Sequence, residues 1–143
     1  MALVYFDSSA LVKLVVDEVG SDLVTVLWNS CDVALSSRLA YPEVCAALAA
    51  AGRNHDLTAS EVARAVADWD RFWSSIRPVE LSAAVEQAAG SLAAKHQLRG
   101  ADAVHLASVS ALGSVDVAVA VWDKRLHAAA LAMGFGVAPA ELN

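Results

Sequence analysis

Short apolar runs alternate along the chain with longer segments whose apolar residues recur at helical spacing. The short runs are rich in β-branched residues and predict five strands, at residues 3–6, 32–36, 77–81, 116–122 and 134–138. The longer segments predict helices over residues 8–17, 21–29, 42–52, 57–76, 82–98, 101–112 and 124–133. Strands that alternate with helices favour an α/β fold: a central parallel sheet of about five strands, flanked by helices on both faces.

Polar residues mark the expected helix starts. Ser21 is the expected N-cap of the second helix, and Pro42 suits the first turn of the third, where its missing N–H is harmless. Thr58 with Glu61 three positions later matches a capping box. These signals support the boundaries drawn from the apolar pattern.

The composition favours one domain over residues 1–143. Hydrophobic residues make up 57% of the chain, yet no uninterrupted apolar run reaches the ~20 residues of a membrane span. No basic residue precedes the first apolar stretch, so we expect no signal peptide, no membrane association and a cytoplasmic location. A net charge of −6 argues against a protein that coats nucleic acid by bulk electrostatics.

Four acids occupy strand ends or helix starts. Asp7 and Asp123 directly follow predicted strands, while Glu43 and Asp102 lie in the first turns of helices. In a parallel sheet these positions converge on one edge, where ligands bind. Each acid alone is explained by helix capping. Together they repel one another unless a cation is bound, and oxygen ligands suit Mg²⁺ or Mn²⁺, which activate water for attack on phosphoryl groups.

Four segments in this order resemble the acidic motifs of the PIN-domain nucleases, and more narrowly the VapC-type toxins of bacterial toxin–antitoxin pairs. They are VYFDSSALVKL, SSRLAYPEV, LRGADAVHLAS and AVAVWDKRLHAAA, and DAVHLA is the most specific stretch. The resemblance implies an endoribonuclease toxin that hydrolyses RNA phosphodiester bonds with Mg²⁺ or Mn²⁺. It also implies an antitoxin that blocks the active site, and a homodimer.

The resemblance places the catalytic, metal-binding positions at Asp7, Glu43, Asp102 and Asp123. Asp7 and Asp102 are the expected direct metal ligands. At Asp123 the chain departs from the family, which often has Thr or Ser one or two positions earlier, where this sequence has Val121 and Trp122. Asp116 is a rival fourth acid, but it precedes its strand and is expected at the opposite end of the sheet.

Several further residues have two interpretations each. Ser9, and more weakly Ser37, either orient the acids or simply start helices; Arg99 either contacts a substrate phosphate or is a solvated charge. Trp69, Phe72 and Trp73 form either core or a partner interface. The spacing Asp102-x-x-His105 puts a histidine on the same helix face as an acid, which suggests a mixed His/carboxylate metal site. Because His105 is embedded in an apolar helix, we expect a packed histidine hydrogen-bonded to a neighbour instead.

Two other functions stay open. One is a catalytically inactive PIN-like module that binds RNA or a partner, although such a module has no use for four clustered carboxylates. The other is a small metal-dependent phosphatase, because FDSSALV resembles the start of haloacid-dehalogenase-type enzymes. Their second aspartate is replaced here by Ser9.

Overall fold

The structure, a computed structural model, describes residues 1–113 and 116–143. Its five strands are β1 (Leu3–Phe6), β2 (Val33–Ser37), β3 (Ile76–Val79), β4 (Ala118–Ala120) and β5 (Gly136–Ala138). All neighbouring strands pair in parallel, in the order β3-β2-β1-β4-β5. The predicted five-stranded parallel sheet is confirmed, although β3 begins one residue earlier than expected and β4 is shorter.

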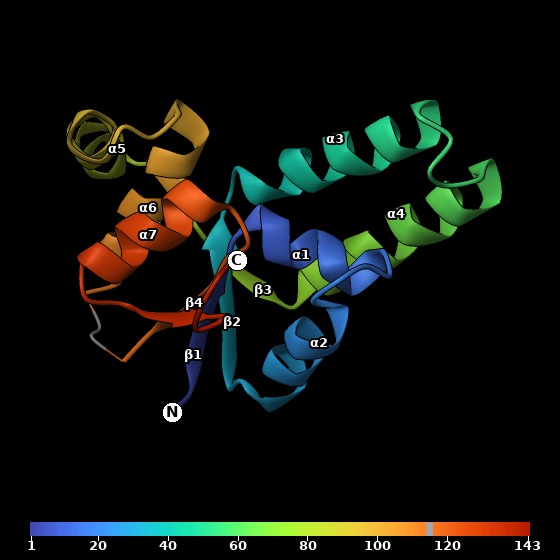
Figure 1. The fold of residues 1–143 in the computed structure, drawn as a ribbon, viewed down its shortest axis with the longest axis horizontal. Coiled ribbons are helices and arrows are strands. Elements are labelled where there is room, and N and C mark those ends of the chain that lie inside the picture. Colours follow the sequence, from blue (N-terminus) through green and yellow to red (C-terminus); the bar gives the residue numbers. More distant parts are fainter. Residues whose placement is uncertain (114–115) are drawn as a thin grey trace.

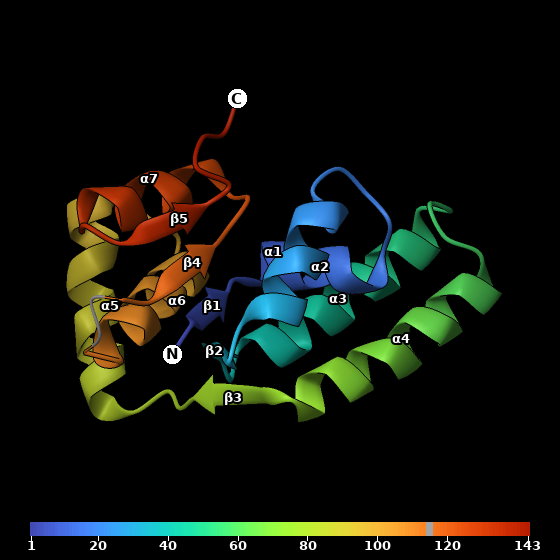
Figure 2. The same cartoon turned by 90° about the horizontal axis from the view of Figure 1, so that it is seen from below.

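In the described ranges, seven helices cover this sheet. They are α1 (Ser8–Val15), α2 (Ser21–Ser30), α3 (Ala40–Arg53), α4 (Ala59–Ser74), α5 (Ala83–His96), α6 (Gly100–Ala111) and α7 (Lys124–Ala132). Figure 1 shows α1 to α4 on one side of the sheet and α5 to α7 on the other. The α3–α4 hairpin projects away from the strands in Figure 2. Within the described ranges, none of the helices is long and apolar enough to cross a bilayer.

The central strand β1 supplies both halves of the core. Val4 and Phe6 pack with α1, α3 and α4, whereas Tyr5 packs with α5, α6 and α7 on the opposite face. All three side chains are buried. A strand buried on both faces is apolar throughout, which explains why β1 lacks the polar alternation of a half-exposed strand.

The expected helix starts are mostly confirmed. Thr58 and Glu61 form the capping box of α4, and Pro42 lies in the first turn of α3. Ser21 is an exception: Gly20, in a left-handed conformation with φ 97°, is the N-cap of α2. The Ser21 hydroxyl instead accepts from the backbone of Glu18 and donates to that of Val16, which stabilises the turn before the helix.

The strand order reverses between β1 and β4, and this reversal positions the site. From β1 the chain builds outward through β2 to β3, and later returns to add β4 and β5 on the other side. The backbone N–H of Asp7 donates to Ala120 O at 2.9 Å, which continues the pairing just beyond β1. Ligands of open parallel sheets bind at such a reversal, beyond the carboxyl ends of the strands.

Candidate active site

A pocket of about 240 Å³ opens where β1 and β4 end. Its wall combines the start of α1, one face of α3 and the first turns of α6 and α7. It is lined by Asp7, Ser8, Ser9, Val12, Glu43, Ala47, Arg99, Asp102 and Asp123. The structure therefore brings together all four acids named from the sequence.

Asp7 has two structural roles. It is the N-cap of α1, where its Oδ2 accepts from the backbone N–H of Ser9 at 3.2 Å and from the Ser9 hydroxyl at 2.6 Å. The residue is only 2% exposed, and its Oδ1 accepts no hydrogen bond from any residue that the structure describes. One oxygen thus caps the helix, and the other is left for a ligand.

Ser9 joins the two strands of the site. Its hydroxyl donates to Asp7 Oδ2 and accepts from the backbone N–H of Trp122 at 2.9 Å. Trp122 immediately precedes Asp123, so the same hydroxyl ties the first acid to the segment that carries the last one. The hydrogen bond expected between Ser9 and Asp7 is present.

Arg99 lies between the other two aspartates. Its guanidinium is 3.4 Å from Asp102 Oδ2 and 3.6 Å from Asp123 Oδ2, and Asp123 also caps α7 by accepting from Leu126 N. Burial raises the pKa of Asp102, the negative charges of Asp123 and Asp7 raise it further, and Arg99 only partly offsets them. The pocket thus holds more negative charge than its own residues neutralise.

His105 is buried and hydrogen-bonded as expected, and the structure adds that one of its partners, Glu43, is an acid of the site. It is 1% exposed, and its Nε2 lies 2.6 Å from Glu43 Oε1 and 3.4 Å from Asp7 Oδ1, while Nδ1 is 2.7 Å from the Tyr5 hydroxyl. Burial alone lowers the pKa of His105, but the charge of Asp7 and the hydrogen bond and charge of Glu43 outweigh it and raise that pKa. The sequence feature that points to the site is the position of His105, three residues after Asp102 on the same face of the helix.

The donors of the pocket fit a hard divalent cation. They are carboxylate oxygens, the ligand type of Mg²⁺ and Mn²⁺, and the buried Asp7 Oδ1 accepts no hydrogen bond from the described residues. Among those same residues, no three His, Cys, Asp or Glu side chains are already arranged to hold a metal ion. A cation in this pocket would therefore require the carboxylates to move closer together.

Other residues named from the sequence lie elsewhere. Ser37 is buried and accepts from the backbone N–H of Leu39, so it stabilises the turn into α3 and is not part of the pocket lining. Asp116 precedes β4, at the end of that strand opposite to Asp123.

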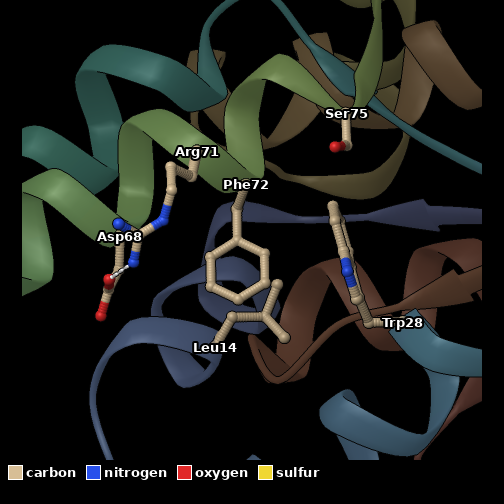
Figure 3. Close-up of a pocket in the computed structure, with 6 residues that line it drawn as sticks. All are labelled: Leu14, Trp28, Asp68, Arg71, Phe72 and Ser75. Carbon is tan, nitrogen blue, oxygen red and sulfur yellow. Dashed lines mark hydrogen bonds and ion pairs between the residues drawn. The ribbon is translucent and has the colours of Figure 1, made fainter.

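The aromatic cluster of α4 divides between core and surface. Trp69 is completely buried in the core and has no surface to offer a partner. Phe72 and Trp73 are half-buried. Phe72 lines a second hollow of about 430 Å³, shown in Figure 3, with Leu14 and Trp28 as its other apolar walls. Asp68, Arg71 and Ser75 form the polar part of this α4 groove.

Comparisons with known proteins agree with this geometry. The PIN domain family model matches residues 4–130. Two Mycobacterium tuberculosis relatives, Ribonuclease VapC45 and Ribonuclease VapC49, are each 65% identical over the whole chain and 99% of their own length. A third, Ribonuclease VapC46, is 36% identical over 96% of this chain and 97% of its own length.

The fold is also that of a solved relative. The crystal structure of Mycobacterium tuberculosis VapC20, described as a sarcin–ricin loop cleaving toxin, superposes with a TM-score of 0.68 at 20% identity. The match covers 92% of this chain and 95% of VapC20. The acidic pocket, the strand order and the full-length similarity all agree: the chain belongs to the PIN-domain family and, within it, to the VapC ribonucleases.

Proposed function

We propose that this protein is a divalent-metal-dependent endoribonuclease whose site is the pocket of Asp7, Glu43, Asp102 and Asp123. The observation that supports the proposal is the buried Oδ1 of Asp7, which accepts no hydrogen bond from the described residues and lies in a pocket with three further carboxylates. Carboxylates gathered in this way are destabilised without a cation. We name Mg²⁺ as the metal, with Mn²⁺ as a substitute.

Each side chain has a stated part in this proposal. Asp7 and Asp102 are direct ligands, and Glu43 and Asp123 complete the donor set. When bound, the cation polarises a phosphoryl oxygen and lowers the pKa of an attacking water. Ser9 holds Asp7 in place, and Arg99, free to leave its two aspartates, binds a phosphate of the substrate.

The substrate is RNA, as the names of the relatives indicate, and local positive charge beside the pocket supports this. Another hollow, of about 480 Å³ and separate from the α4 groove, shares Arg99 and Asp123 with the acidic pocket. It is also lined by Lys124 and Arg125. Neither of these two cations forms an ion pair with a residue in the described ranges. In a chain of net charge −6, they are a suitable contact for a polyanion.

The biological role that follows is that of the toxin in a type II toxin–antitoxin pair, acting as one domain in the cytoplasm. The antitoxin would block the acidic pocket with a basic segment and pack an apolar helix into the α4 groove, beside Phe72. We also propose that the toxin forms a homodimer, with the half-buried Phe72 and Trp73 as candidates for either interface.

Cleavage of total cellular RNA by the purified protein tests the proposal. We expect discrete fragments with Mg²⁺ or Mn²⁺, none with EDTA, and at least a 100-fold loss of rate in the Asp7→Asn/Asp102→Asn double variant. The Asp22→Asn/Asp56→Asn variant is the matched control, because it removes two exposed carboxylates far from the pocket lining. Cleavage that survives EDTA or the loss of both pocket acids would contradict the proposal.

A further inference from the structure

A series of short contacts through Tyr5 and His105 connects the core to the acidic pocket. Tyr5, on the central strand β1, is fully buried, and its hydroxyl is 2.7 Å from Nδ1 of His105 on α6. The other ring nitrogen, Nε2, is 2.6 Å from Glu43 Oε1 and 3.4 Å from Asp7 Oδ1. The imidazole edge therefore faces two carboxylates that belong to different elements, α3 and the end of β1.

The chemistry of these contacts determines where a proton must be. A carboxylate only accepts hydrogen bonds, so the contact with Glu43 requires an N–H at Nε2 of His105. This holds whether the ring is neutral, with Nδ1 accepting from Tyr5, or charged, with Nδ1 donating to it. In both states the Nε2–H donates to Glu43, and Asp7 Oδ1 lies 3.4 Å from the same nitrogen.

We propose that His105 is a positioning residue of the metal site: its Nε2–H holds Glu43 beside Asp7, and the Tyr5 hydroxyl fixes the orientation of the ring. The proposal rests on the proposed function, because it assigns these two carboxylates to a metal. Carboxylates that bind a metal are themselves held by hydrogen bonds, and the bond at one nitrogen of an imidazole sets which proton the other nitrogen carries.

Packing alone does not account for this arrangement. Burying an imidazole and a phenol is unfavourable unless their polar atoms are paired. Within the described residues, the hydrogen bonds of the His105 ring go to Tyr5 and to an acid of the pocket. The neighbouring positions of α6 that face the core, such as Leu106 and Val109, are filled by apolar residues. A leucine at position 105 would satisfy the core and leave Glu43 unsupported.

The test compares Mn²⁺ binding by calorimetry with RNA cleavage in variants of the full chain. His105→Leu removes the N–H, and we expect it to weaken Mn²⁺ binding 10- to 100-fold, the usual effect of losing a group that supports a metal ligand. His105→Gln keeps an N–H donor on a side chain of similar reach and should recover most of this loss. Tyr5→Phe should fall at the lower end of the range.

His127 provides the control. It is also buried, but its Nε2 bonds to the backbone oxygen of Pro139 at 2.7 Å, outside the acidic pocket. His127→Leu should lower the thermal midpoint and leave the Mn²⁺ affinity unchanged. A similar loss of affinity in this variant would show that any buried histidine has the effect, and would overturn the proposal.

The remaining outcomes are separable. If His105→Leu folds and binds Mn²⁺ as the wild type does, or if His105→Gln is no better than His105→Leu, the N–H has no positioning role. If His105→Leu fails to fold, wild-type affinity in Tyr5→Phe overturns the proposal, because loss of the Tyr5 hydroxyl is expected to weaken Mn²⁺ binding. A wild-type protein that neither binds Mn²⁺ nor cleaves RNA would overturn the proposed function and this role with it.

Discussion

Asp7 shows how one side chain combines folding and chemistry. Its Oδ2 caps α1 and is held by Ser9, while its Oδ1 is buried and accepts no hydrogen bond from the described residues. The first arrangement stabilises the fold, and the second costs stability. Capping uses only one of the two oxygens, so it does not conflict with the proposed role of Asp7 as a metal ligand.

At Asp102 we expect stability and activity to be in conflict, so that replacing this residue stabilises the fold and abolishes cleavage. Burial and the charges of Asp123 and Asp7 raise its pKa, so at neutral pH the ionised carboxylate is less stable in the folded protein than in the unfolded chain. We therefore expect Asp102→Asn to raise the thermal midpoint in EDTA by roughly 1–4 °C, less than about 1 kcal/mol. The same change should abolish cleavage.

Differential scanning calorimetry with and without Mn²⁺ checks this expectation. The metal should raise the midpoint of the wild type and have a much smaller effect on Asp102→Asn. Asp56→Asn, which removes an exposed charge from the loop between α3 and α4, should match the wild type in both conditions. A lower midpoint for Asp102→Asn in EDTA would show that its charge is not a source of strain.

At the scale of elements, the loop before α2 packs directly on the segment that precedes α7. Gly20 has φ 97°, and a Cβ at this position would lie 2.9 Å from the indole of Trp122. Trp122 in turn donates its backbone N–H to Ser9. A loop that contributes nothing to the pocket lining therefore helps to place the residues that do.

Two glycine substitutions should have opposite effects on stability. Gly20→Ala combines an unfavourable positive φ with a clash against Trp122, and we expect it to lower the free energy of unfolding by at least about 1–2 kcal/mol. Gly90→Ala lies inside α5 with no atom within 4 Å of the added Cβ, and should raise it by about 0.5–1 kcal/mol. Urea unfolding monitored by circular dichroism measures both. A neutral Gly20→Ala would mean that the Trp122 contact is dispensable.

For the molecule as a whole, most of the fold and the acids of the site were predicted from the sequence. Alternation of apolar runs with helical patterns predicted all five strands, because strands buried on both faces are continuously apolar. Acids at strand ends were found because the edge of a parallel sheet brings such positions together. Local pattern and topology together were sufficient at this level.

What escaped prediction depends on contacts between distant segments. From the sequence, the contact of His105 with the site could not be predicted, because its polar partners Tyr5 and Glu43 lie 100 and 62 positions away in the chain. Ser21 was assigned a cap by residue type, whereas the left-handed backbone of Gly20 starts the helix. Trp69 is core and Phe72 half-exposed although they are one helical turn apart, and only the packing of the hairpin decides this.

If Lys124 and Arg125 contact RNA phosphates, the affinity for RNA should depend on the salt concentration through these two cations. Binding of fluorescent single-stranded RNA to the inactive Asp7→Asn/Asp102→Asn protein should weaken with salt. The additional Lys124→Gln/Arg125→Gln change should reduce the slope of log K against log salt concentration by about 1.4, or about 0.7 per lost phosphate contact.

The control for this measurement is Arg53→Gln/Arg64→Gln, which removes two exposed cations from the α3–α4 hairpin. This pair should leave the slope almost unchanged. Equal slopes for the two double variants would show that RNA does not approach across the hollow beside Asp123, even if the protein cleaves RNA.

The insertion of β1 between β2 and β4 has a consequence for synthesis on the ribosome. The first strand of the chain is the middle strand of the sheet, and its second neighbour, β4, is made only after Asp7, Glu43 and Asp102 have been synthesised. A nascent chain therefore holds three of the acids without the strand end that precedes the fourth. The complete set of pocket acids comes together only after β4 and the start of α7 have left the ribosome.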